Sequence, residues 1–223
     1  MTSNAPRPMI AVVAPENEAP VKLYYSRNLN PRVGVAVARY LNSPVEYVRA
    51  SPRNPSNTEA FRAINPNALV PVLVDGETRL WETDAIACKL SAISGTDFWR
   101  NGLEQPEMIK WISWSAYHLT LAASPLYFFR IVVPQFSDEK PDPVLMANAL
   151  RDFREHAATL DAALADRTWL LGDRISYADF RVATPLPFAD GAGLPLSEFP
   201  NVKRWHDRLL EIPAWRAPFE ELA

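Results

Sequence analysis

The sequence predicts an α/β domain with the element order βαβαββα, followed by an all-α helical-bundle domain. Residues 65–90, NPNALVPVLVDGETRLWETDAIACKL, read as two short strands joined by a tight turn and followed at once by a helix. Beyond residue 104, apolar side chains recur at helical spacing. We therefore expect a mixed domain at residues 21–94, a linker at 95–104 and a helical domain at 105–223.

The first elements are predicted to be strand, helix and strand. VKLYYS at residues 21–26 has the apolar and aromatic content of a strand. Asn30 and Pro31 then begin a helix, because Asn is a good N-cap and proline suits the first helical position. Residues 45–48 are the second strand. Because a helix connects the two strands, we expect them to be parallel.

Two less regular stretches flank these elements. Residues 1–20 contain several prolines and a short apolar core, and they are interpreted as a loosely ordered leader. After the second strand, a loop rich in proline and asparagine leads into a short helix at residues 58–64, which ends before Pro66.

The hairpin that follows carries the most specific signals. Pro71 cannot donate a hydrogen bond to a sheet, so it belongs at the start of its strand. Asp75-Gly76 is a dipeptide typical of a primed hairpin turn, since glycine tolerates positive φ. The Val70-Pro71 bond can be cis at a cost of only about 0.5 to 1 kcal/mol. A cis bond would turn the main-chain N–H and C=O of Val70 outward.

The second strand of the hairpin runs directly into a helix. Thr83 is the predicted N-cap, and the helical pattern continues to Gly95. A helix start offers unpaired N–H groups and a partial positive charge, so it suits a ligand carboxylate. Glu82 beside it could accept a ligand ammonium group. One zwitterionic amino-acid end would fit both features.

In this order and spacing, residues 65–90 resemble the second half of the thioredoxin-like domain of cytosolic glutathione transferases. The resemblance covers about residues 21–218. It implies that the main chain of Val70, before a cis Pro71, binds the cysteinyl unit of glutathione. It also implies that Glu82 and Thr83 hold the γ-glutamyl end. Glutathione would be a cosubstrate, and the resemblance further implies a homodimer with the glutathione site near its interface.

Prolines and caps place the helices of the second domain. Pro106 begins the first helix, Asp142 and Pro143 begin a long second one, and Pro200 and Pro213 begin two short helices near the end. The predicted apolar face of the first helix comprises Met108, Ile109, Trp111, Ile112 and Leu119.

Ser176-Tyr-Ala-Asp179 is a variant of the helix capping box. The surrounding WLLGDRISYADF resembles the family's second domain, where a buried aspartate begins a core helix. Ser176 and Asp179 are therefore carried over as structural residues. Inward-facing Val202, Trp205 and Leu209 are expected near the chain end.

Glutathione transfer needs the ligand thiol to be ionised near pH 7, although a free thiol titrates near pKa 8.5. A hydrogen-bond donor from the loop after the first strand would stabilise the thiolate. Relatives place Ser, Tyr or Cys there, whereas this chain has SRNLNPR. Alignment on the following helix selects Asn28, and alignment on the strand selects Leu29 or Asn30. Asn28 is the first catalytic candidate, Asn30 the second and Ser26 the third.

Two further features concern the ligands. Leu69 stands where many relatives have a lysine that contacts the glycyl carboxylate of glutathione, so Arg49 or Arg53 is a candidate replacement. The family's second-substrate pocket is lined from the first helices of the second domain, where this chain is rich in aromatic residues. The candidates for an apolar or aromatic electrophile are Trp114, Tyr117, His118 and Phe128, with Tyr127 and Phe129 beside them.

Composition excludes several other classes. A formal net charge of −3 and a pI near 5.7 argue against non-specific nucleic-acid binding. Cys88 is the only cysteine and the three histidines are far apart in sequence, so neither a disulfide nor a metal site is expected. No apolar run reaches the roughly 18 residues of a membrane span. These features fit a cytoplasmic protein.

The leading hypothesis is therefore a detoxifying glutathione transferase. A glutathione transferase-like binding or regulatory protein is the first alternative, because the loop has no Ser, Tyr or Cys at the aligned position and Leu69 replaces lysine. Glutathione-dependent reduction of peroxides or disulfides is the second, because it needs a bound thiolate but no protein cysteine.

Overall fold

The structure is a computed structural model that describes residues 20–222. The predicted leader lies outside the described residues, apart from Pro20. The first seven elements are β1 (Val21–Tyr25), α1 (Leu29–Tyr40), β2 (Val45–Arg49), α2 (Pro55–Arg62), β3 (Val72–Asp75), β4 (Thr78–Trp81) and α3 (Thr83–Ile93). The predicted order βαβαββα is confirmed.

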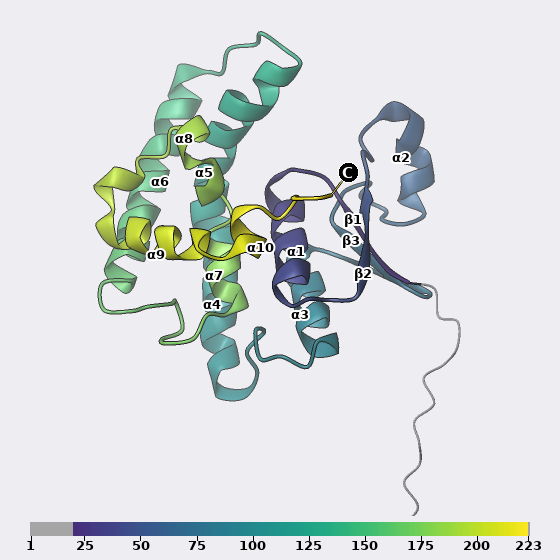
Figure 1. Cartoon of the computed structure of the whole chain (residues 1–223). Helices are drawn as coiled ribbons and strands as arrows, with labels where there is room; N and C mark the ends of the chain where they lie inside the picture. The colour runs from purple at the N-terminus through teal and green to yellow at the C-terminus, as the bar shows by residue number, and fades with distance from the viewer. Residues whose placement is uncertain (1–19, 223) are drawn as a thin grey trace, which may run out of the picture.

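These strands form one sheet in the order β2-β1-β3-β4. The first two strands are parallel, as predicted, with Val21 opposite Val45. The β1–β3 and β3–β4 pairs are antiparallel. Helices α1 and α3 lie between the sheet and the helical part, while α2 lies on the other side of the sheet (Figure 1). The sheet therefore presents one covered face to the rest of the molecule.

The second part of the chain is helical. Its α-helices are α4 (Gln105–Trp114), α5 (Thr120–Tyr127), α6 (Pro143–Ala163), α7 (Tyr177–Val182), α8 (Ala189–Ala192), α9 (Pro200–Leu210) and α10 (Pro213–Arg216). Short 3-10 turns occur at Gly102–Glu104, Val133–Gln135, Leu186–Phe188 and Leu196–Glu198. The first of these turns falls within the predicted linker. The predicted starts at Pro143, Pro200 and Pro213 are confirmed.

The long segment Gly102–Gln135 is continuous helix with two π-helical turns, Ser115–Leu119 and Phe128–Val132. By length and composition alone this segment is long and apolar enough to cross a membrane. The sequence analysis did not predict such a segment. Here its elements pack against α6 and α7. Its buried side chains include Met108, Leu119, Ala123 and Leu126. Of its apolar 18-residue window, 33% is buried inside the structure.

Some predicted boundaries were wrong. Helix α1 begins at Leu29 with Asn28 as N-cap, because the Arg32 N–H donates to the Asn28 carbonyl at 2.9 Å. Asn30 is therefore within the first turn. Pro31 is tolerated there because the first N–H groups of a helix have no intrahelical partner.

Helix α2 also begins earlier than predicted. Asn54 caps it, accepting a hydrogen bond from the Ser56 N–H at 3.2 Å, and Pro55 follows as the first helical residue. In the hairpin, Asp75 still pairs with Thr78, so the turn residues are Gly76 and Glu77. Gly76 has the expected positive φ, at 55°.

Two other side chains have positions that differ from those predicted from the sequence. Thr83 is the first residue of α3, and Glu82 is its N-cap. Ile109 was assigned to a buried face but is 44% exposed, because Met108 and Ile112 already occupy the side of α4 that faces the core.

His206 on α9 gives the fold a predicted pH dependence. Burial lowers the pKa of its imidazole from 6.5 to about 4. Between these values the unfolded chain binds more protons than the folded chain, so the free energy of unfolding should fall as the pH falls from 6.5 towards 4. The slope is at most about 1.4 kcal/mol per pH unit. Urea unfolding at several pH values measures it.

The variant His206→Gln, which cannot titrate there, should show a flatter profile across the same window. Equal slopes for the two proteins would contradict the assignment of this acid sensitivity to His206.

Candidate functional site

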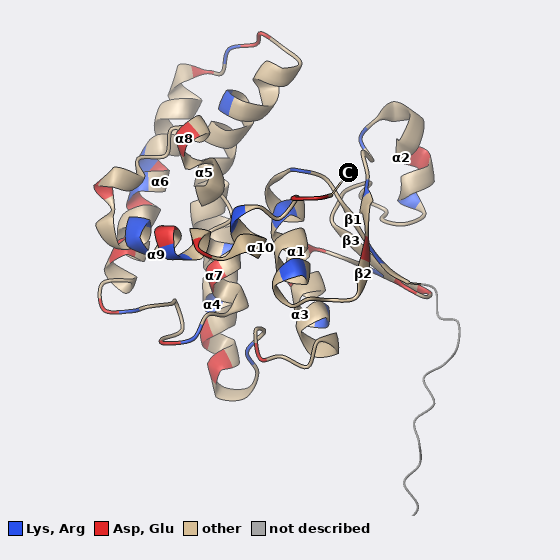
Figure 2. Cartoon of the chain, in the orientation of Figure 1, with Lys and Arg blue, Asp and Glu red and all other residues tan. Residues whose placement is uncertain are grey.

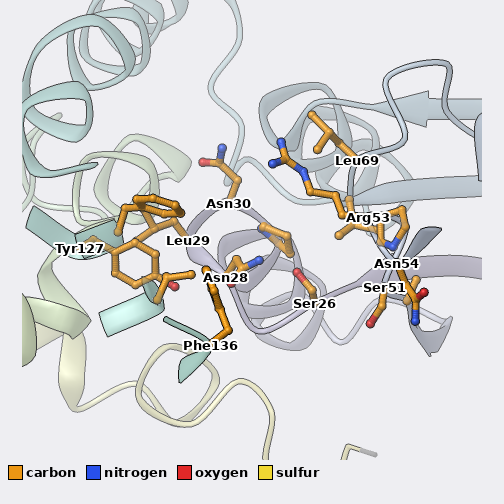
Figure 3. Close-up of a pocket in the computed structure, with 16 residues that line it drawn as sticks. Ser26, Asn28, Leu29, Asn30, Ser51, Arg53, Asn54, Leu69, Tyr127 and Phe136 are labelled. Carbon is orange, nitrogen blue, oxygen red and sulfur yellow. The ribbon is translucent and has the colours of Figure 1, made fainter. Parts of the chain in front are cut away.

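A cavity of about 630 Å³ lies between the α/β part and the helical part. Its wall on the α/β side comes from the loops that follow β1 and β2 and from the loop before β3. Its other wall comes from the end of the long helical segment. Figure 3 shows Ser26 and Asn28 between the aromatic side chains of Tyr127 and Phe136 and the group formed by Arg53, Asn54 and Leu69. The cavity therefore combines polar and apolar surfaces.

Asn28 and Asn30 both line this cavity, but their side-chain contacts differ. Asn28 is extended, with φ −89° and ψ 176°, and its side chain makes no cap hydrogen bond. The Asn30 side-chain oxygen instead accepts a hydrogen bond from Arg181 at 3.3 Å. The Arg181 contact uses only the oxygen of Asn30, so the amide N–H groups of both residues are free to donate to a ligand. The same contact fixes the orientation of the Asn30 side chain across the interface between the two parts.

Ser26 lines the same cavity from the end of β1. Its hydroxyl is buried and has no hydrogen-bond partner among the described residues. A buried hydroxyl without a partner is costly, and such a group often has a functional reason. The sequence ranked Ser26 third, and this geometry makes it the main alternative to Asn28.

The predicted glutathione-binding residues lie around one edge of the cavity. The Val70-Pro71 peptide bond is cis, and Val70 lines the cavity while Pro71 is buried. Glu82 has φ 71°, a strained value for a residue other than glycine. Strain of this kind persists where the surroundings fix it, often at functional sites. Thr83 is buried, and its hydroxyl donates to the carbonyl of Asn30 at 3.3 Å.

Glu82 does not line the cavity itself, but it directly precedes Thr83 at this edge. Its side chain is exposed, and no described residue forms an ion pair or hydrogen bond with its carboxylate. The carboxylate is therefore free to accept a ligand ammonium group.

A buried network connects α7 to this edge. The Arg181 Nε atom lies 2.9 Å from Asp84 Oδ1 in an ion pair without hydrogen-bond alignment. The Tyr177 hydroxyl donates to the same Asp84 oxygen at 2.5 Å. Burial and the Asp84 charge raise the pKa of Tyr177 well above its usual value, so the hydroxyl remains a donor. Together with the Arg181–Asn30 hydrogen bond, these contacts fix the starts of α1 and α3. Sequence reasoning missed this network.

Of the two arginine candidates for the glycyl carboxylate, only one lines the cavity. Arg53 lines the cavity, and its guanidinium lies beside Leu69 in Figure 3. Arg49 is at the end of β2, exposed, and does not line the cavity. Leu69 is 40% exposed at the rim, so it leaves the approach to Arg53 open.

The predicted second-substrate residues are not together. Phe128 lines the cavity, with Tyr127 beside it. Tyr117 and His118 instead line a different hollow between α5 and α6, which also contains His156. Trp114 packs against Trp111 and His118 and does not line the main cavity. For these three residues, the structure corrects the prediction.

Sequence reasoning missed Val132 and Phe136, which complete the apolar wall. The physical reason is the two π-helical turns, at Ser115–Leu119 and Phe128–Val132. A π turn has i→i+5 hydrogen bonds, so it rotates the residues after it relative to a regular 3.6-residue period. The apolar run FFRIVVPQF was the sequence feature that could have indicated this wall. Periodicity could not show which of its side chains face the cavity.

Neither a metal nor a protein thiol is indicated at this site. Among residues 20–222, no group of three or more His, Cys, Asp or Glu side chains is placed to hold a metal ion. Cys88 is half-buried within α3, away from the cavity lining, and burial raises the pKa of its thiol. A raised pKa makes a thiol a weaker nucleophile near neutral pH.

Comparisons with known proteins match both parts of the chain to one family. The glutathione S-transferase N-terminal domain matches residues 19–88, and the glutathione S-transferase C-terminal domain matches residues 143–208. Glutathione S-transferase GstB of Escherichia coli (strain K12) is 32% identical over 183 residues, covering 79% of this chain and 86% of that protein. Glutathione S-transferase 3 of Zea mays is 30% identical over 213 residues, covering 89% and 92%.

Solved structures give the same picture of the fold. Maize glutathione S-transferase I in complex with an atrazine glutathione conjugate superposes with a TM-score of 0.81 at 25% identity, covering 92% of this chain and 100% of that one. Human glutathione S-transferase T1-1, in its apo form, has a TM-score of 0.81 at 23% identity and covers 90% of this chain and 88% of that one. The thioredoxin-like sheet with a helical second part is thus shared.

Proposed function

This chain belongs to the glutathione S-transferase family, and we propose that it binds glutathione and conjugates the thiol to an apolar or aromatic electrophile. The observation that carries the proposal is the single cavity that brings together the free Asn28 amide, the main chain at Val70 and an aromatic wall. In this proposal residues 21–94 form the glutathione-binding domain, and residues 105–223, after the linker at 95–104, supply the wall for the second substrate.

Glutathione would lie along the edge formed by the loop before β3 and the start of α3. The main-chain N–H and C=O of Val70 pair with the cysteinyl unit. The carboxylate of Glu82 accepts the γ-glutamyl ammonium group. Because the Thr83 hydroxyl already donates to Asn30, the main-chain N–H groups at the start of α3 receive the γ-glutamyl carboxylate.

The thiolate would then point at the start of α1. Asn28 donates its amide N–H to the sulfur, and the partial positive charge of the helix N-terminus adds to the stabilisation. No acidic residue in the first turn of α1 opposes this charge. Asn28 holds the thiolate but does not remove its proton, because an amide is not a base near pH 7. The Ser26 hydroxyl is the second candidate donor.

We predict that Arg53 binds the glycyl carboxylate. Replacing it by glutamine should raise the KM for glutathione about five- to tenfold, because one charge-assisted hydrogen bond at an exposed rim is worth about 1 kcal/mol or slightly more. The kcat should change little, since this end of glutathione is remote from the sulfur. Steady-state kinetics at varied glutathione measures both constants.

Arg49→Gln is the matched control, because Arg49 is also exposed but does not line the cavity. A larger rise in KM for Arg49→Gln than for Arg53→Gln would transfer the role to Arg49.

The electrophile would occupy the apolar side of the cavity. Phe128 is 45% exposed and Phe136 is 69% exposed, so a flat apolar molecule would remove both rings from water. Burying apolar surface contributes about 25 cal/mol per Å². Val132 and Tyr127 complete this wall.

Two assays test the proposed function together. The protein should be retained on immobilised glutathione, and it should increase the rate of conjugation of chloronitroaromatic electrophiles. Retention without turnover on several electrophiles would indicate a binding protein, and turnover with a peroxide or mixed disulfide would indicate a glutathione-dependent reductase. Failure of both retention and turnover would reject the proposal.

We also propose that the protein is a cytoplasmic homodimer that acts in detoxification. Exposed apolar side chains on α4 to α6 support an interface between copies. They are Ile109, Tyr117, Leu121 and Leu145. Light scattering coupled to gel filtration should give twice the chain mass; a monomer over a wide concentration range would reject the dimer.

A nucleic acid or a membrane is not among the proposed partners, and neither is a metal cofactor.

A further inference from the structure

Residues 213–222, which we call the C-terminal segment, run from α10 across α1 towards β1 (Figure 1). None of them lines the cavity that contains Asn28. The segment nevertheless contacts the chain on both sides of Asn28. Any effect of this segment on the reaction must therefore act through the residues that it contacts.

Before Asn28, the segment contacts the end of β1 and the loop that follows. The ring of Phe219 stacks on that of Tyr25, the last residue of β1, with centroids 5.7 Å apart and planes 15° apart. The Arg27 guanidinium lies 5.7 Å from the Phe219 centroid. Its Nη2 atom also donates to the Leu222 carbonyl at 3.3 Å. These contacts hold the chain up to the residue before Asn28.

After Asn28, the segment contacts α1. The buried guanidinium of Arg32 lies over the Trp215 ring, 4.6 Å from the centroid, and donates to the Trp215 carbonyl. The Arg32 N–H in turn donates to the Asn28 carbonyl at 2.9 Å. Further along α1, Arg39 donates to the Pro218 carbonyl at 3.2 Å. Figure 2 shows basic segments on α1 and α10, which pack against each other.

The loop between these two sets of contacts has few other side-chain restraints. Within residues 20–222, the Ser26 hydroxyl has no hydrogen-bond partner, and the Asn28 side chain makes no cap hydrogen bond. Arg27 is the loop residue whose side chain is held, and the segment supplies both of its contacts. A donor stabilises an anion well only when it is preorganised, and a displacement of about 1 Å can cost about 100-fold in rate.

We propose that the C-terminal segment is a positioning element, which holds the Asn28 amide at the place where the glutathione sulfur binds. The proposal rests on the proposed glutathione transfer. Phe219 and Arg27 are positioning residues on one side of Asn28, and Trp215 and Arg32 are positioning residues on the other. If these contacts are loosened, the amide can move away from the sulfur, so the thiolate loses stabilisation and the thiol pKa rises.

Phe219→Ala tests the proposal, because it removes the ring stacking without changing a charge. The pKa of the bound glutathione thiol should rise by about 0.5 to 1, and kcat/KM near pH 7 should fall about three- to tenfold. The loss should shrink as the pH rises above the new pKa, which a general loss of folded protein would not show. Phe219→Tyr keeps the ring and should behave as the wild type. Thiolate absorbance and kcat/KM across pH measure these effects.

Trp169→Ala is the matched control. The half-buried Trp169 ring makes a similar contact with an arginine, because the Arg208 guanidinium lies 5.6 Å from its centroid and donates to the Thr168 carbonyl at 2.8 Å. Neither residue lines the cavity. The thiol pKa in Trp169→Ala should equal that of the wild type. If Phe219→Ala yields no soluble protein, Arg27→Lys replaces it, since lysine keeps the charge but lacks the planar group that stacks on a ring.

Hydrogen exchange without glutathione measures the positioning by itself. Peptides from residues 25–32 should exchange faster in Phe219→Ala than in the wild type, whereas peptides from residues 70–83 should be unchanged. Unchanged exchange at residues 25–32 would overturn the proposal, and so would equal thiol pKa values in Phe219→Ala and Trp169→Ala. A wild type that binds no glutathione would reject the proposed function and this role with it. The two failures are distinguishable, because the exchange measurement needs no ligand.

Discussion

The variant Asn28→Ala should show a raised thiol pKa of bound glutathione and a kcat/KM about 100-fold lower near pH 7. Removing one preorganised donor from a developing or stable anion costs about 2.7 kcal/mol or more in comparable sites. The Asn28 amide is the donor in our proposal, because its side chain makes no cap hydrogen bond and it lines the cavity.

The direction of the expected shift in the pH–rate profile follows from the ionisation of the glutathione thiol. Without the donor, the thiolate is less stable, so its pKa rises and the pH–rate profile shifts to higher pH. The activity deficit should therefore shrink as the pH rises above the new pKa. Thiolate absorbance of the bound glutathione and kcat/KM across pH measure the two effects independently.

Asn30→Ala and Ser26→Ala are the comparison variants. Asn30 is held by Arg181, so its replacement should lower activity less and shift the thiol pKa little. A larger pKa shift in Ser26→Ala than in Asn28→Ala would assign the sulfur contact to the hydroxyl. Unchanged pKa values in all three variants would refute the placement of the thiolate at this loop.

Asp179→Ala should destabilise the protein by about 3 to 5 kcal/mol, the largest stability effect that we predict. Asp179 is fully buried at the start of α7. Its carboxylate accepts hydrogen bonds from the Leu170 N–H at 2.9 Å, the Ser176 N–H at 2.9 Å and the Trp205 indole at 3.0 Å. The Ser176 hydroxyl also donates to this carboxylate, at 3.2 Å. Alanine would remove the acceptor of all four buried donors, and each donor left without a partner costs about 1 to 3 kcal/mol.

Urea unfolding of both proteins measures the difference. Asp173→Ala is the control, because Asp173 is exposed and close by in the chain, and its replacement should change the free energy of unfolding by no more than about 0.5 kcal/mol. If Asp179→Ala yields no soluble protein, Asp179→Asn keeps the shape and should be intermediate. Equal stability of Asp179→Ala and Asp173→Ala would contradict the structural role.

Much of the site's α/β side could be predicted from the chain. The strands around Gly76 and the helix start beside Glu82 and Thr83 depend on neighbours within a few residues. The capping box at Ser176 was predicted for the same reason. The local sequence only allowed a cis Val70-Pro71 bond, and the family resemblance implied it. Proline geometry, positive φ at glycine and helix capping are local effects, so a short stretch of sequence is enough to specify them.

The choice between Asn28 and Asn30 could not be made in this way. It depends on Arg181, which is 151 positions from Asn30 along the chain. It also depends on the actual start of α1, where a main-chain hydrogen bond placed the N-cap two residues before the predicted one. Asn is equally suited to capping and to ligand binding, so residue type did not distinguish these roles.

The order of the elements, the hairpin and the capping box at Ser176 were thus determined by the sequence alone, because periodicity and capping act over one or two turns. The tertiary structure decided that Phe128, Val132 and Phe136 face the cavity while Trp114 and Tyr117 do not. It also placed the C-terminal segment against Arg27 and Arg32. These contacts join distant segments, and a π turn rotates the helix faces that periodicity assigns, so only three-dimensional packing could settle them.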